Sequence, residues 1–291
     1  MGKDKSTVEQ FEVTLAHKRS NKMDLSKGCL IQPKLDGVRC YTRLVGEEIK
    51  MFSRNHKEFM NCDHLKVELY GFFMAYPDRI LDGELYNHEY KDNFNEIISI
   101  VRKQKPTIED KVKSAEKLEY HVYDCFDLIN PDLKYISRLS NIYHAQNEFK
   151  WNMIKDVDTF DVFDEYDVDH FEDLFLSQGY EGAMLRDNGA YEQRRSHGLQ
   201  KVKRFSDAEF TITGFVEGNG KFSGGLGKFI GVDENGLEIM VPYQKCTIKL
   251  RKQLWENRKA YLGKVATFEF FERTPAGAYR FPQFKGLRDY E

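Results

Sequence analysis

A lysine close to an arginine gives this sequence its clearest candidate nucleophile. Lys34 stands two residues before an Asp36-Gly37 pair, and Arg39 follows that pair. An Asp-Gly pair between short apolar runs is typical of a β-hairpin, so we expect a strand on each side of it. Neighbouring cations disfavour each other's charge, and a lysine loses its proton more readily than an arginine. Lys34 could therefore act as a nucleophile while Arg39 holds a phosphate. The alternative is a surface hairpin with solvated charges.

Four other short motifs carry side chains that such a lysine would need. Guanidinium groups bind phosphate, carboxylates bind hard cations, and two lysines spaced by one residue face the same side of an extended segment. Each motif alone also fits an ordinary hairpin edge, helix end or solvated strand face. The motifs are Ser53-Arg54, Asp82-Gly83-Glu84, Glu181-Gly182 and Lys201-Val202-Lys203.

The composition is that of a globular protein with reduced thiols. The 291 residues suffice for one large domain or two ordinary ones, and 41% hydrophobic with 31% charged residues excludes a disordered or fibrous chain. No apolar run reaches membrane-spanning length, so we expect no membrane contact and a cytoplasmic location, in a host cell if the source is viral. The cysteines are scattered without a Cys-x-x-Cys pair, which argues against a disulfide framework or a zinc site. They are Cys29, Cys40, Cys62, Cys125 and Cys246.

The net charge of −3 is unevenly distributed along the chain. Residues 194–291 hold 18 Lys and Arg against 11 Asp and Glu, so this part carries +7 and the remainder carries −10. Nine acidic residues lie between positions 156 and 173, where no Lys or Arg occurs. A basic C-terminal third suits a protein that contacts an anionic polymer locally.

The pattern of apolar residues predicts a mixed domain followed by a smaller β-rich one. We expect helices near 8–16, 62–73, 94–102, 137–149 and 171–178, and strands at 30–43, 49–54, 80–86, 120–126 and 183–186. From residue 209 onward, strands at 210–216, 228–232, 237–241 and 265–271 surround one helix at 249–261. Several short strands with one helix favour a Greek-key barrel of the OB type, and we place the boundary between residues 206 and 207.

Taken in order, the motifs resemble the covalent nucleotidyltransferase superfamily, and most closely the small ATP-dependent DNA ligases of bacteriophages and algal viruses. The resemblance covers residues 30–288. It implies an α+β fold, in which a nucleotidyltransferase domain of ATP-grasp-like antiparallel sheets plus helices (1–206) precedes a C-terminal OB-fold β-barrel (207–291). The matching positions are Lys34-x-Asp36-Gly37-x-Arg39, Ser53-Arg54, Asp82-Gly83-Glu84, Tyr123-Asp124, Glu181-Gly182, Lys201-x-Lys203 and Arg280-Phe281-Pro282-x-Phe284-x-Gly286-x-Arg288.

The resemblance implies an ATP-dependent DNA ligase that needs Mg²⁺. Lys34 would attack the α-phosphate of ATP, pass AMP to the 5′-phosphate of nicked duplex DNA, and the 3′-hydroxyl would then displace AMP. The residues implied at the ATP or AMP site are Gln32, Lys34, Arg39, Arg54, Glu84, Tyr123, Lys201 and Lys203.

Particular roles follow from the same resemblance. Lys201 and Lys203 would hold the α-phosphate and help to keep Lys34 unprotonated, and Tyr123 would stack on adenine. Glu84 and Glu181 would be ligands of Mg²⁺. The DNA 5′-phosphate would contact Arg39, Arg54 and Arg195, and pyrophosphate would be clamped on domain closure by Arg280 and Arg288.

The sequence departs from the family pattern at its end, where Arg288-Asp289-Tyr290-Glu291 lacks the lysine that often closes the last motif. We expect a monomer with no separate DNA-binding domain ahead of Lys34 and no long insertion in the OB region. An RNA ligase or an mRNA-capping guanylyltransferase shares the same motifs and is the alternative enzyme. A non-catalytic OB-fold protein that binds nucleic acid is the alternative of another class.

Overall fold

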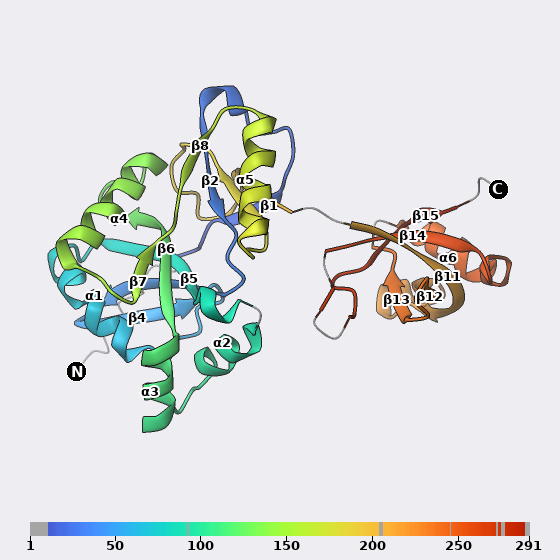
Figure 1. Ribbon diagram of the computed structural model, residues 1–291, viewed down its shortest axis with the longest axis horizontal. Helices are drawn as coiled ribbons and strands as arrows, with labels where there is room; N and C mark the ends of the chain where they lie inside the picture. The colour runs from blue at the N-terminus through green and yellow to red at the C-terminus, as the bar shows by residue number, and fades with distance from the viewer. Residues whose placement is uncertain are drawn as a thin grey trace, which may run out of the picture. The chain divides into compact units, whose positions relative to one another are not determined.

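The computed structural model describes residues 11–91, 93–203, 206–244, 246–271, 273–274 and 277–288 (Figure 1). The chain divides into two compact units, Met1–Lys203 and Arg204–Glu291. The boundary expected between residues 206 and 207 lies inside strand β11 (Ser206–Glu217), whose first residues already pair within the second unit. No helix of the described residues is long and apolar enough to cross a membrane.

One sheet of the first unit has the strand order β4-β3-β5-β6-β7. Its strands are antiparallel except for the parallel β6–β7 pair, and they pack with the helices around a core that includes Leu65, Leu69 and Tyr120. The strands are β3 (Val38–Val45), β4 (Glu48–Ser53), β5 (Arg79–Tyr86), β6 (Glu119–Asp127) and β7 (Ile154–Asp156). The helices are α1 (Asp63–Ala75), α2 (Phe94–Val101), α3 (Ile108–Lys117) and α4 (Tyr135–Phe149).

A second sheet in the same unit has the order β1-β10-β9-β2-β8. Helix α5 (Glu165–Ser177) packs on it through Val168 and Phe175, which are buried with Ile31 and Leu185 of the sheet. Its strands are β1 (Leu15–Lys18), β2 (Cys29–Pro33), β8 (Phe160–Val162), β9 (Ala183–Arg186) and β10 (Arg195–Val202). Short 3₁₀ helices in the two units are η1 (Leu25–Lys27), η2 (His88–Tyr90), η3 (Gly220–Phe222) and η4 (Arg258–Tyr261).

Helix α1 illustrates how the sequence forms these elements. Leu65, Leu69 and Phe72 are four and three residues apart and share its buried face. The expected helix at 8–16 is wrong where the structure describes it, since residues 11–14 are not helical and β1 begins at Leu15; residues 8–10 lie outside the described part. Phe11 and Val13 are buried on either side of the exposed Glu12, which is the period of an extended chain.

The expected hairpin around Asp36-Gly37 is also wrong. Strands form on both sides of the pair, but β2 and β3 belong to different sheets and do not pair with each other. A Cβ atom on Gly37 would lie 2.5 Å from the carbonyl oxygen of Leu85. The glycine therefore permits a close approach to β5 as the chain passes from one sheet to the other, rather than a tight turn.

The second unit is a five-stranded antiparallel sheet with the order β13-β12-β11-β14-β15. Phe210, Phe229 and Phe268 form the centre of its core. The other elements are β12 (Leu226–Asp233), β13 (Glu238–Pro242), helix α6 (Ile248–Glu256), β14 (Val265–Phe270) and β15 (Gln283–Leu287).

The closed barrel expected for this unit is not found in the described residues, where β13 and β15 remain the two edges. The ring of Phe284 on β15 stacks on Phe229 at 4.5 Å and meets Tyr243 at 4.7 Å between ring centroids. Aromatic side chains thus connect β15 with β12 and with Tyr243 next to β13, where the described residues form no backbone ladder that would close the barrel.

Candidate active site

A cavity of about 260 Å³ lies in the first unit, with walls from both of its sheets. Strands β1, β2, β9 and β10 contribute from one sheet, and β3, β5 and β6 contribute from the other. The lining residues that the sequence motifs predict are Gln32, Lys34, Arg39, Arg54, Glu84, Tyr123, Arg195 and Lys201. The wall also contains residues that these motifs do not include, among them Met184, Arg186 and Leu199.

Lys34 is held beside the carboxylate of Glu181. The Nζ of Lys34 forms an ion pair with one oxygen of Glu181, and the Nζ of Lys203 forms an ion pair with the other. The backbone joins the same segments, because Lys34 N donates to Gly182 O at 2.9 Å and Glu181 N donates to Lys34 O at 3.1 Å. Gly182 has a φ of +137°, and a Cβ there would lie 2.5 Å from Val202 O, so only glycine suits this position.

Lys201 and Lys203 therefore lie in different surroundings. Lys201 lines the cavity, where burial first and the charge of Lys34 second lower the pKa of Lys201. Lys203 contacts Glu181 instead. A cation in the cavity wall is placed to stabilise an anion next to Lys34.

Arg39 makes a paired contact that the sequence did not reveal. Its Nε donates to Asp82 Oδ1 at 3.0 Å, its Nη2 donates to Asp82 Oδ2 at 2.5 Å, and Tyr191 also donates to Oδ2 at 2.7 Å. Burial is the largest influence on Arg39 and acts to lower its pKa, but Asp82, Tyr123 and Tyr191 together outweigh burial, so the pKa of Arg39 is raised. The charge of Arg39 is neutralised by Asp82. Lys201 is therefore better placed than Arg39 to be the cation that acts on Lys34.

Glu84 is the acidic side chain of the cavity wall. Burial raises the pKa of Glu84 to about 7, although Lys34 and Arg39 act against that shift. The hydroxyl of Tyr123 donates to Glu84 Oε2 at 3.5 Å, and the guanidinium groups of Arg39 and Arg186 lie 5.7 and 5.1 Å from the Tyr123 ring centroid. In the described part of the chain, no group of three or more His, Cys, Asp or Glu side chains is arranged to hold a metal ion.

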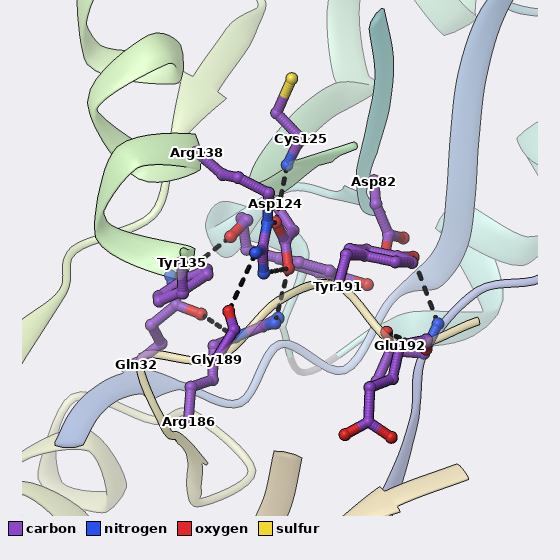
Figure 2. Close-up of polar contacts among 12 residues, drawn as sticks. Gln32, Asp82, Asp124, Cys125, Tyr135, Arg138, Arg186, Gly189, Tyr191 and Glu192 are labelled. Atoms are coloured by element: carbon purple, nitrogen blue, oxygen red, sulfur yellow. Dashed lines mark hydrogen bonds and ion pairs between the residues drawn. The ribbon is translucent and has the colours of Figure 1, made fainter. Parts of the chain in front are cut away.

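A buried polar network borders the cavity through Gln32 and Arg186 (Figure 2). Asp124 binds Arg138 through Oδ1 at 2.7 Å and Arg186 through Oδ2 at 3.1 Å. Arg186 in turn donates from Nε to Gln32 Oε1 at 2.9 Å. The network joins β2, β6, β9 and α4, so it fixes the two sheets at the cavity. An arginine at the end of the otherwise apolar Ala183–Arg186 run was the signal in the sequence that could have identified it.

A second cavity of about 720 Å³ shares Arg39, Arg54 and Glu84 with the first. Its wall also contains Lys57 and Arg102, which are exposed. This cavity extends the positive surface away from Lys34.

Arg280 and Arg288 belong to the second unit. Arg280 lies with its guanidinium 5.7 Å from the ring of Phe281, and Arg288 forms an ion pair with Glu209. Their expected role at pyrophosphate stays a prediction.

Family comparisons divide the chain in the same order as the sequence motifs. A model described as "ATP dependent DNA ligase domain" matches residues 12–203, and a model described as "DNA ligase OB-like domain" matches residues 217–288. A DNA ligase of African swine fever virus (isolate Pig/Kenya/KEN-50/1950) is 31% identical over 264 residues, which cover 84% of this chain and 60% of the viral protein. The chain thus spans about 60% of the length of the curated relatives that it matches first.

Solved structures show the same architecture. "Pmar-Lig_PreS3" has a TM-score of 0.79 at 25% identity, with 96% of this chain and 68% of that chain covered. The structure described as "DNA binding with a minimal scaffold: Structure-function analysis of Lig E DNA ligases" has a TM-score of 0.74 at 24% identity, with 95% of this chain and 99% of that chain covered, which shows the fold. A Chlorella virus DNA ligase-adenylate has a TM-score of 0.51 at 25% identity, with 97% and 99% covered.

Proposed function

This chain belongs to the ATP-dependent DNA ligase family, and from that premise we propose that it joins a 3′-hydroxyl to a 5′-phosphate at nicks in duplex DNA, with AMP carried on Lys34. The observation that carries the proposal is the cavity that gathers Lys34, Lys201, Arg54 and Glu84 from separate strands and loops. The relatives are DNA ligases, so the RNA ligase and capping-enzyme alternatives are not favoured. We also propose a monomer, in the cytoplasm of a host cell if the source is viral.

In the first step, the Nζ lone pair of Lys34 attacks the α-phosphorus of ATP. A nitrogen–phosphorus bond forms, the bond to the pyrophosphate oxygen breaks so that pyrophosphate leaves with its electron pair, and the proton of the amine passes to Glu181, its hydrogen-bond partner. Glu181 accepts a hydrogen bond from this Nζ and so fixes the position of the Lys34 side chain, which lines the cavity. Lys201 stabilises the charge that spreads over the α-phosphate.

The residues present fit Mg²⁺ bound mainly by the nucleotide. Mg²⁺ commonly takes one or two protein carboxylates and completes its shell with phosphates and water. Glu84 would supply such a carboxylate: burial raises its pKa to about 7 against the opposing charges of Lys34 and Arg39, and a bound cation would act in the same direction as those charges. When bound, the metal would neutralise phosphate charge. Glu181 is already shared by Lys34 and Lys203, so it is the weaker candidate of the two expected ligands.

In the later steps, AMP passes from Lys34 to the 5′-phosphate of the nick, and the 3′-hydroxyl then attacks that phosphorus and releases AMP. Arg54 and Arg195 line the cavity and hold the 5′-phosphate, whereas Arg39 is turned to Asp82 and contributes less. Lys57 and Arg102 extend this phosphate-binding surface into the second cavity. Arg280 and Arg288 of the second unit would hold the leaving pyrophosphate.

The test is transfer of label from α-labelled ATP to the protein in Mg²⁺, followed by sealing of a nicked DNA duplex. Lys34→Ala should abolish both. Lys27→Ala removes an exposed lysine that pairs with Asp24 at 3.2 Å, and it should leave both unchanged. Label acquired only from GTP, or sealing of nicked RNA but not of nicked DNA, would contradict the proposal.

A further inference from the structure

The side-chain amide of Gln32 is bonded at both of its ends. Its Oε1 accepts from Arg186 Nε at 2.9 Å, and its Nε2 donates to Thr159 Oγ1 at 2.9 Å. Gln32 is 1% exposed and lines the nucleotide cavity. The amide is therefore held in place at the wall of the site.

The direction of the amide is fixed by the chemistry of its partners. Arg186 can only donate, so the group facing it must be the amide oxygen. At the other end, the hydroxyl of Thr159 donates its proton to Val157 O at 2.8 Å, so it accepts from Gln32. A flipped amide would set its NH₂ group against a guanidinium and its oxygen against an oxygen that has no proton to give.

The sheet places both partners on Gln32. Strand β8 pairs with β2 in the register Ile31–Phe160, which puts Thr159 opposite Gln32. On the other side, Gln32 pairs with Met184, and Arg186 lies two residues along the same face of β9. Asp124 holds Arg186 at 3.1 Å, so that end is itself fixed.

We propose that Thr159 is a positioning residue. Together with Arg186, it holds the Gln32 amide in the orientation that accepts the 6-amino group of adenine and rejects the 6-oxo group of other purines. This inference rests on the proposed function. The amide keeps one acceptor lone pair and one N–H for a ligand, which match the N6 amino group and the N1 atom of adenine. A 6-oxopurine offers the reverse pattern at that edge, and it would need the amide flip that the two partners prevent.

The first test uses the unaltered chain, so it does not depend on the folding of a variant. Formation of the lysine adduct is compared for ATP, GTP and inosine triphosphate, which has the 6-oxo group but no 2-amino group. We expect kcat/KM for inosine triphosphate to be as low as that for GTP, because rejection acts at the 6-position. Equal use of ATP and inosine triphosphate would overturn the inference.

The second test assigns the effect to Thr159. Thr159→Val removes the hydroxyl and keeps the shape, and it should lower the preference for ATP over GTP roughly tenfold, the effect of one hydrogen bond. Thr159→Val should raise KM for ATP and leave kcat unchanged. Thr159→Ser keeps the hydroxyl and should retain the preference of the unaltered chain.

Tyr143 supplies a matched control, because it is another hydrogen-bond partner of Thr159 but lies outside the Arg186–Gln32–Thr159 chain. Tyr143→Phe should keep the preference for ATP. An unchanged preference in Thr159→Val, or an equal loss in Thr159→Ser, would overturn the inference while adduct formation from ATP continued. Absence of any adduct in the unaltered chain would instead contradict the proposed function.

Discussion

Lys34 and Glu181 are joined by both side chain and backbone. Their side chains form an ion pair, and Glu181 N donates to Lys34 O at 3.1 Å. The same carboxylate also pairs with Lys203, so it stands between two ammonium groups. The backbone contact sets the position of the lysine, and the carboxylate sets the direction of its amine.

Replacing Glu181 should therefore slow the first step. Glu181→Gln keeps the size but removes the charge, and charge-assisted hydrogen bonds contribute about 1.5–3 kcal/mol. We expect formation of the lysine adduct to slow by roughly 10- to 100-fold. The measurement is single-turnover labelling from ATP. Glu165→Gln is the control, because Glu165 pairs with Arg19 at an exposed position; an equal loss there would contradict the assignment.

Asp82 should stabilise the folded protein as well as hold Arg39 at the site. Asp82 is 1% exposed and accepts from both Arg39 and Tyr191. Asp82→Asn would leave the charge of Arg39 without its buried partner, which costs about 3 kcal/mol in the free energy of unfolding. Urea denaturation measures it. Glu48→Gln removes an exposed pair with Lys50 and should change stability by less than about 1 kcal/mol. A similar small loss in Asp82→Asn would contradict the prediction.

Glu84 should make stability depend on pH. Burial raises the pKa of Glu84 to about 7 from 4.5, so the folded state binds the proton more tightly than the unfolded state. The contribution of the Glu84 proton to the free energy of unfolding is complete below about pH 4.5, and it is lost as pH rises through about 7. Part of Glu84 faces the cavity, where water screens its charge, so we expect a loss of about 2 kcal/mol.

The measurement for Glu84 is the free energy of unfolding at pH 5 and pH 8. Glu84→Gln should lose less stability than the unaltered chain over this interval, and Glu47→Gln, at an exposed position, should follow the unaltered chain. Added Mg²⁺ and ATP should reduce the loss at pH 8. Identical pH profiles for Glu84→Gln and the unaltered chain would exclude this role of Glu84.

Arg102 should affect DNA binding and not the first step. It lines the second cavity and is exposed. Arg102→Ala should weaken binding to nicked DNA and reduce the slope of log K against log salt by about 0.9, the value for one phosphate contact. Labelling from ATP should stay unchanged. The neighbouring Lys103 pairs with Asp110 at 3.1 Å, so Lys103→Ala is the matched control. If the slope of log K against log salt were unaltered in Arg102→Ala, this residue would not be part of the surface that contacts DNA phosphates.

Several features were predictable because they depend on residue type and order along the chain. The Lys34 motif, the two glutamate motifs and Lys201 could be recognised locally, and the apolar spacing of Leu65, Leu69 and Phe72 predicts helix α1. The division into an α+β unit and a β-rich unit also follows from such local patterns.

Tertiary structure decided which of these segments meet. The hairpin around Asp36-Gly37 failed because strand pairing is set by contacts far apart in sequence, and β2 takes β8 and β9 as partners instead of β3. The β3–β5 register puts Arg39 opposite Glu84 and within reach of Asp82 on the same face. Thr159 and Arg186 meet Gln32 for the same reason. The sequence by itself determined the chemical groups of the site, whereas the pairing of strands that lie far apart in the sequence decided their partners.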